Sequence, residues 1–99
     1  MLEAHPRIVE RARSSIKGFD IVYNKLVQWV ILEDKSISTL NNYMRRIASL
    51  SLHFKRLPEN ISDEEINGYL ANLAISSNSP SRTSFKHTVY GLRYYFRHS

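Results

Sequence analysis

Apolar residues recur at the spacing of an α-helix along almost the whole of this 99-residue chain, and no other feature constrains its fold as strongly. The stretch from Leu40 to Phe54 shows the pattern clearly, because an apolar residue returns every three or four positions. Glycine and proline, the residues that interrupt helices, number three each. The pattern therefore predicts an all-α fold of five helices without a sheet.

Capping residues predict where these helices begin and end. Pro6 suits the first turn of a short helix that ends at Gly18, and the hydroxyl of Ser36 can accept from the first turn of a later helix. Residues 62–65, Ser-Asp-Glu-Glu, form a capping box, and Ser81 can cap the last helix. The predicted helices span about residues 6–18, 19–33, 36–56, 62–75 and 81–99.

One side of each predicted helix is apolar and is expected to form the core. These predicted core residues are Ile8, Val9, Ala12, Ile16, Val22, Leu26, Trp29, Val30, Leu40, Tyr43, Met44, Ile47, Leu50, Phe54, Ile66, Tyr69, Leu70, Leu73, Phe85, Val89, Leu92 and Phe96. The helix at 19–33 is apolar on a second side as well, through Ile21, Val27, Ile31 and Leu32. That second side needs a cover, which could be the first helix or another subunit.

The composition favours a binding protein over an enzyme. A chain of 99 residues forms one modest core and leaves little room for a deep active site. There is no cysteine, and the four histidines are too scattered to ligate a metal, so we expect neither a metal nor a cofactor nor a small-molecule substrate. No stretch resembles a signal peptide or a membrane span, which predicts a cytoplasmic protein without a membrane partner.

Charge is segregated along the chain. The net charge is +5, and residues 35–56 contain five basic residues and no acidic one. Residues 57–80 contain four acidic residues and no basic one, and residues 81–99 contain four basic residues and no acidic one. Surfaces that are merely solvated intersperse the two signs, so the helices at 36–56 and 81–99 are candidates for contact with an acidic polymer.

Each of these two helices carries a basic, hydrogen-bonding stripe when successive residues are turned by about 100°. The first stripe comprises Ser38, Asn42, Arg45, Ser49 and Arg56, with Arg46 and His53 beside it. The second comprises Arg82, Lys86, Tyr90, Arg93 and Arg97, with Thr83, His87 and Tyr94 beside it, which predicts a surface position for Tyr94. Protein–DNA interfaces use this mixture of cations and short polar side chains, but two solvated helix faces would show it too.

The openings of the basic helices resemble a known family. Residues 36–43 resemble the Ser-Pro-x-Thr-x-x-x-Tyr opening of the second helix in the core-binding domain of tyrosine recombinases, the phage integrase family, with Ile37 in place of proline. Residues 60–70 resemble the family's next helix. Residues 79–84 and 89–96 resemble its Ser-Pro-x-Thr and Leu-x-x-Leu-Arg-x-Phe-Tyr motifs. The resemblance covers about residues 19–99.

This resemblance implies a four-helix SAM-like orthogonal bundle at residues 19–99. The helical pattern, and not the resemblance, adds a short helical arm at residues 1–18. The resemblance also implies that duplex DNA and other recombinase subunits are the partners, and that catalysis belongs to a C-terminal domain absent from this chain. Tyr43, Leu70, Leu92 and Tyr95 would be core residues. Together with the stripes, the resemblance gives these DNA-contact candidates: Lys35, Ser38, Thr39, Asn42, Arg45, Arg46, Arg82, Thr83, Ser84, Lys86, His87 and Arg93.

Two further features bear on this interpretation. Residues 53–56, His-Phe-Lys-Arg, match the family's catalytic His-x-x-Arg as a string, but the other catalytic elements are missing, and we assign no catalytic residue. The last helix has no stop signal before Ser99, which predicts that the chain is part of a longer protein. The alternative interpretation is a SAM-like protein–protein interaction module that docks through the second apolar side of the helix at 19–33.

Overall fold

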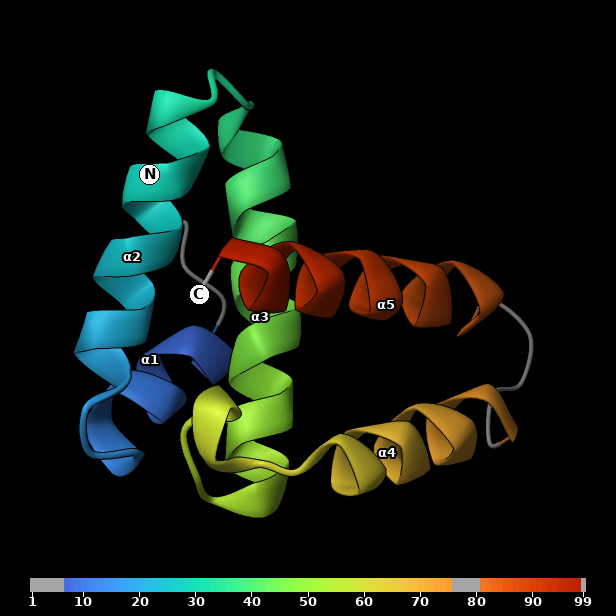
Figure 1. The fold of residues 1–99 in the computed structure, drawn as a ribbon. Coiled ribbons are helices and arrows are strands. Elements are labelled where there is room, and N and C mark those ends of the chain that lie inside the picture. Colours follow the sequence, from blue (N-terminus) through green and yellow to red (C-terminus); the bar gives the residue numbers. More distant parts are fainter. Residues whose placement is uncertain (1–6, 76–80, 99) are drawn as a thin grey trace.

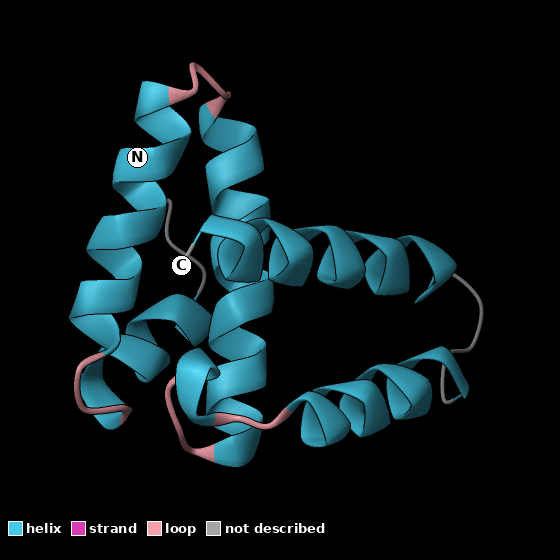
Figure 2. Cartoon of the chain, in the orientation of Figure 1, coloured by secondary structure: helices cyan, strands magenta, loops and turns pink. Residues whose placement is uncertain are grey.

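The fold is built from α-helices. The structure, a computed structural model, describes residues 7–75 and 81–98, and only the backbone at 81–84. Within these residues there is no strand, and the predicted all-α fold of five helices is confirmed (Figure 2). The elements are α1 (Arg7–Ser15), α2 (Phe19–Leu32), α3 (Ile37–Phe54), a single 3-10 turn at Pro58–Asn60, α4 (Asp63–Ile75) and α5 (Ser81–His98).

α3 is the central helix of the fold. α2 runs beside it in the opposite direction, α1 packs near its C-terminal half, and α5 crosses its middle at a steep angle (Figure 1). α4 packs chiefly against α5. Because α3 contacts α1, α2 and α5, most of the core lies along its apolar side.

The core draws on every helix. Its buried apolar members are Val9, Ala12, Ile16, Phe19, Val22, Leu26, Val30, Leu40, Met44, Ile47, Ala48, Leu50, Ile61, Ile66, Leu92, Tyr94 and Tyr95. Several predicted core residues, including Trp29, Tyr43 and Leu70, are partly buried and pack against it. Val9 and Ala12 of α1 are completely buried, so the first helix folds back onto α3. The predicted boundary at residue 18 stays a prediction.

Two of the predicted helix starts have the expected capping contacts. The Ser36 Oγ accepts from the Thr39 backbone N–H at 3.0 Å. In the capping box, the Ser62 Oγ accepts from the Glu65 N–H at 3.1 Å, and the Glu65 Oε1 accepts from the Ser62 N–H at 3.0 Å. The predicted start at Pro6 and the predicted cap by the Ser81 side chain lie outside the described residues.

The predicted surface position of Tyr94 is wrong. Its ring is buried, with 2% of the residue exposed, at 5.1 Å from the ring of Tyr43 on α3. Its hydroxyl donates to Glu33 at the end of α2, at 3.0 Å. The end of α5 therefore lies against both α2 and α3 and buries a wider face than a single apolar stripe suggests.

The second apolar side of α2 remains open. Val27 packs against the core, but Ile21, Ile31 and Leu32 are 62%, 64% and 76% exposed. Since α1 packs mainly on α3, it does not cover these side chains. Cover by another subunit stays a prediction.

Candidate nucleic-acid interface

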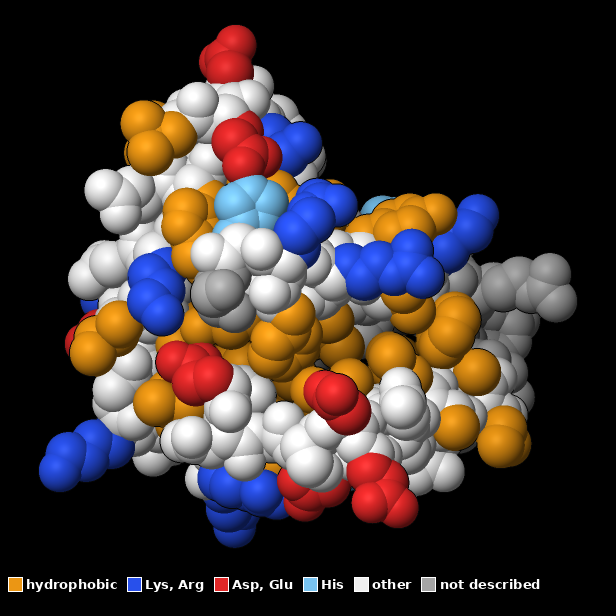
Figure 3. Space-filling model, viewed as in Figure 1, with side chains coloured by type: hydrophobic (Ala, Val, Ile, Leu, Met, Phe, Trp, Pro, Cys, Tyr) orange, Lys and Arg blue, Asp and Glu red, His pale blue; other side chains and the backbone are white. Residues whose placement is uncertain are grey.

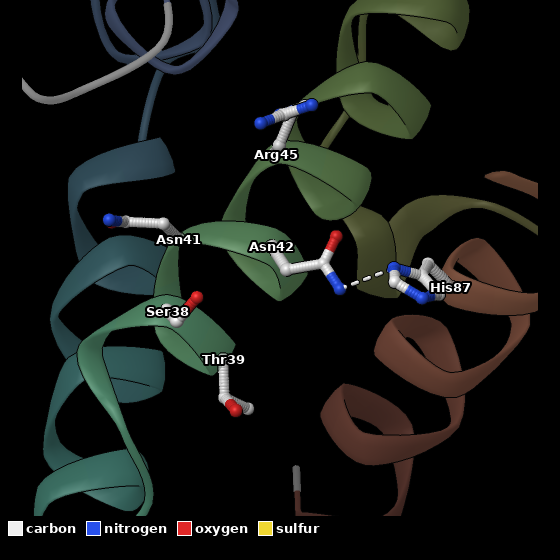
Figure 4. Close-up of a pocket in the computed structure, with 6 residues that line it drawn as sticks. All are labelled: Ser38, Thr39, Asn41, Asn42, Arg45 and His87. Atoms are coloured by element: carbon white, nitrogen blue, oxygen red, sulfur yellow. Dashed lines mark hydrogen bonds between the residues drawn. The ribbon is translucent and has the colours of Figure 1, made fainter. Parts of the chain in front are cut away.

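An open hollow of about 480 Å³ lies between the first half of α3 and α5 (Figure 4). It is lined by Ser38, Thr39, Asn41, Asn42, Arg45 and His87. Five of these side chains come from α3, whereas His87 comes from α5. The hollow thus brings together residues that are more than 40 positions apart in the chain, and all of them are polar or charged.

The start of α3 is held rigidly by its cap. The Ser36 Oγ accepts from the Thr39 backbone N–H, and the Ser36 hydroxyl donates to the Thr39 Oγ1, both at 3.0 Å. From this fixed start, the helical repeat places Ser38, Asn42 and Arg45 on successive turns of one side. The positive end of the helix dipole also lies at this end of the hollow, and it favours an anion there.

A hydrogen bond links the two helices across the hollow. The Asn42 Nδ2 lies 2.7 Å from the His87 Nδ1, and both side chains are half-buried. Figure 4 shows the amide nitrogen turned toward the imidazole ring and the amide oxygen turned away from it. The orientation of the Asn42 side chain is therefore set by a residue of α5.

Several cations of this region have no acidic partner. Arg45, Lys86 and Arg93 are exposed, and none of them forms an ion pair within the described part of the chain. Figure 3 shows basic side chains along α5, with acidic side chains gathered near the start of α4. Unneutralised cations of this kind can bind phosphate groups without breaking an existing ion pair.

Comparison with known families identifies the domain. The sequence model for the phage integrase N-terminal SAM-like domain matches residues 22–99. The chain belongs to this family. No curated protein and no solved structure matched the chain.

The family match begins within α2 and includes both helices that line the hollow. In this phage integrase SAM-like domain, five of the predicted contact residues come together there: Ser38, Thr39, Asn42, Arg45 and His87. The side chains of Arg82, Thr83 and Ser84 lie outside the described residues. Asn41 also lines the hollow but was not predicted, because turning successive residues by 100° selected a single narrow stripe of α3. α5 crosses α3 at a steep angle (Figure 1), so the hollow is wider than that stripe.

Four other predicted contact residues do not line the hollow. Lys86 and Arg93 are exposed on α5, and the Lys35 Nζ lies 5.7 Å above the ring of Tyr94. Arg46 is half-buried where α3 and α5 cross. Burial, and to a lesser degree the adjacent Arg45, lower the pKa of Arg46, but a guanidinium stays charged at neutral pH. These residues could extend the hollow into a larger basic face.

Gly91 allows the integrase-type domain to bring α5 so close to α3. A Cβ atom placed on Gly91 would lie 3.4 Å from the Arg46 Cβ and 3.5 Å from the Tyr43 Cα. A methyl group would fit at ordinary contact distance, but a larger side chain would push the helices apart. The spacing between Asn42 and His87 depends on this crossing.

The basic residues at the other end of α3 are engaged differently. Arg56, which the stripe placed with Arg45, forms an ion pair with Glu65 of α4 at 2.6 Å. That contact, followed by the Ser62 N–H, lowers the pKa of Glu65 to about 2. The His53 ring packs 5.0 Å from the Tyr69 ring of α4. Both ends of the His-x-x-Arg string are therefore in contact with α4.

Two other features are absent from the described residues. These residues contain no cluster of three or more His, Cys, Asp or Glu that could hold a metal ion. None of the described helices is both long and apolar enough to cross a membrane.

Proposed function

We propose that this domain binds duplex DNA through the face formed by α3 and α5, as the core-binding domain of a tyrosine recombinase. In this role it positions a recombination site for a separate catalytic domain. The observation that carries the proposal is the hollow, which gathers the side chains of Ser38, Thr39, Asn42, Arg45 and His87 from two helices.

The chemistry of this face suits DNA. Arg45, Lys86 and Arg93 supply charge for phosphates, and the serine, threonine and asparagine side chains supply short, directional hydrogen bonds. Asparagine and arginine also read adenine and guanine edges when they enter a major groove. Family membership adds weight, because a phage integrase acts on DNA.

Binding of a short duplex, followed by fluorescence anisotropy at several salt concentrations, tests this proposal. Lys86→Glu/Arg93→Glu and Arg45→Glu/Arg46→Glu should each weaken binding by on the order of tenfold or more and reduce its salt dependence. Arg11→Glu/Lys17→Glu is the matched control, because it makes the same change in net charge at exposed residues that do not line the hollow.

The two test variants differ in how far they could disturb the fold. Arg46 is half-buried, so its reversal must be accompanied by a thermal unfolding curve, whereas Lys86 and Arg93 are exposed and can be reversed without disturbing the core. If the control and Lys86→Glu/Arg93→Glu lost the same amount of binding affinity, the loss would follow from the change in net charge alone. That outcome, or no loss at all, would remove this face from the proposal.

Docking to another protein is the second candidate function. It is favoured by Ile21, Ile31 and Leu32, which leave one side of α2 apolar and exposed. The partner could be another recombinase subunit. Amide chemical shifts separate the two functions: DNA should perturb α3 and α5, whereas a protein partner that binds this side should perturb α2.

A further inference from the structure

We propose that the hollow between α3 and α5 receives one phosphate group of the DNA backbone, and that His87 donates a hydrogen bond to this phosphate from its Nε2–H. Asn42 acts through His87, because its amide holds the ring in the tautomer that can donate. This inference rests on the proposed function, since it assigns a part of the DNA to the α3–α5 face. It starts from the hydrogen bond that joins the Asn42 Nδ2 and the His87 Nδ1 at 2.7 Å.

The tautomer of His87 follows from the chemistry of this bond. The nitrogen of a side-chain amide donates and does not accept, so the His87 Nδ1 must be the acceptor. An imidazole ring that accepts at Nδ1 is neutral and carries its proton on Nε2. His87 is therefore an uncharged ring with a single N–H donor, and the bond to Asn42 fixes which nitrogen carries it.

The Nε2–H of His87 is available to a partner. Among the side chains that the structure describes, His87 forms its hydrogen bond through Nδ1, and Figure 4 shows the other ring nitrogen turned away from Asn42. The ring is half-buried and lines the hollow. A complex that excludes water from this site must supply an acceptor, because a buried donor left without one costs free energy.

The other groups that line the hollow favour an anionic acceptor. Arg45 is a cation without an ion pair among the described residues, Ser38 supplies an exposed hydroxyl, and no acidic side chain lines the hollow. A phosphate oxygen is an anion, whereas the acceptors on base edges are neutral, and a hydrogen bond to an ionised acceptor is the stronger. Every step of a duplex presents a phosphate, so this contact does not depend on the DNA sequence.

The test uses the full chain and several short duplexes of unrelated sequence, with affinities measured by fluorescence anisotropy. His87→Leu removes both ring nitrogens and should weaken binding to every duplex by on the order of tenfold. His87→Gln should keep most of the affinity, because its amide nitrogen can donate from about the place of Nε2. His87→Asn is the matched control: its shorter amide reaches the place of Nδ1 only, so it should bind as weakly as His87→Leu.

An uncharged donor also has a distinct salt dependence. The slope of log affinity against log salt concentration counts the cations that neutralise phosphates. His87→Leu should therefore lower the affinity by the same factor at every salt concentration, whereas Lys86→Gln/Arg93→Gln should make the slope shallower. A shallower slope in His87→Leu would mean that the ring binds as a cation and would overturn the inference.

A double-mutant cycle tests the positioning role of Asn42. Asn42→Leu should weaken binding in the parent but not in the His87→Leu background, because a positioning residue acts only through the ring that it holds. Losses that add would mean that Asn42 acts independently of His87, against the inference. In the free domain, ¹⁵N chemical shifts of the His87 ring should show the proton on Nε2. A proton on Nδ1 would overturn the inference without any reference to DNA.

The outcomes also distinguish this inference from the proposed function. If the parent binds no duplex, the proposed function fails and takes the inference with it. If the three His87 variants, shown to be folded by thermal unfolding, bind as the parent does while Lys86→Glu/Arg93→Glu binds more weakly, DNA binding stands and the inference is wrong. A loss on one duplex and not on the others would mean that His87 contacts a base, which also overturns the phosphate assignment.

Discussion

α4 and α5 both follow α3 in the chain, but they are held in the fold by different forces. Among the described residues, α5 buries Thr88, Gly91, Leu92, Tyr94 and Tyr95, whereas α4 buries only Ile66. α4 is instead fixed at its start by polar contacts, namely its capping box and the ion pair between Arg56 and Glu65.

This difference explains why a basic residue at one end of α3 is paired with an acid and one in its first half is not. At the far end of α3, Arg56 is paired with an acid of the polar-anchored helix α4. In the first half of α3, Arg45 lines the hollow beside α5, and α5 contains no acidic residue. Packing therefore fixes the geometry of the candidate interface while leaving its charge unneutralised. Local sequence charge alone would not separate these two cases.

Of the substitutions that compare α5 with α4, the replacement of a helix glycine by leucine should change the free energy of unfolding most. Gly91→Leu should lower the free energy of unfolding by about 1–3 kcal/mol, because α5 lies so close to α3 that the added atoms have no room. Gly68→Leu in α4 is the matched control, since nothing lies within 4 Å of its Cβ position. It should leave stability unchanged or raise it by up to ~1 kcal/mol through helix propensity. Chemical denaturation measures both, and equal effects would mean that α5 is no more tightly packed than α4.

Removal of a buried hydroxyl group from α5 should have a smaller effect. The Tyr95 hydroxyl donates to Glu59 at 2.9 Å, so Tyr95→Phe should cost about 1 kcal/mol of unfolding free energy. Tyr90→Phe is the control, because Tyr90 is 48% exposed, and it should change stability by less than about 0.5 kcal/mol.

The same tyrosine also predicts an alkaline transition. Burial, and then the hydrogen bond to Glu59, raise the pKa of Tyr95 above its ordinary value of 10.0. The unfolded chain therefore loses this proton first, and the contribution of Tyr95 to stability is lost as the pH rises above that value. Tyr95→Phe should flatten this part of the stability profile, and an unchanged profile would exclude Tyr95 as its source.

The smallest effect is expected at the polar anchor of α4. Because Arg56 lowers the pKa of Glu65 from 4.5 to about 2, its contribution is complete above pH 4.5 and is lost as the pH falls toward 2. Unfolding curves over this range should show that Glu65→Gln reduces the acid sensitivity of the parent. Glu64→Gln, an exposed acid that forms no ion pair among the described residues, should follow the parent.

Local features of the chain were predictable because short-range chemistry determines them. The helical spacing predicted the five helices, and the hydroxyls of Ser36 and Ser62 predicted two of their starts. In α4, Asn67 and Gly68 form a pair that is common in hairpin turns, but Ile66, Tyr69 and Leu70 at helical spacing prevail.

Features that depend on two helices were not predictable in the same way. Tyr94 is buried because α2 supplies Glu33 for its hydroxyl and α3 supplies Tyr43 for its ring. Asn42 and His87 were both candidates, but their hydrogen bond depends on where α5 crosses α3. Neither the crossing angle nor the spacing of the helices can be calculated from the pattern of one helix.

The packing of α1 has a consequence for how the domain is delimited. Its Val9 and Ala12 are completely buried, yet both precede residue 22, where the likeness to the family begins. The part of the chain that matches the family model is therefore smaller than the part whose side chains share one core. Sequence likeness and shared burial thus set different boundaries for the domain, because α1 adds buried apolar surface outside the matched residues.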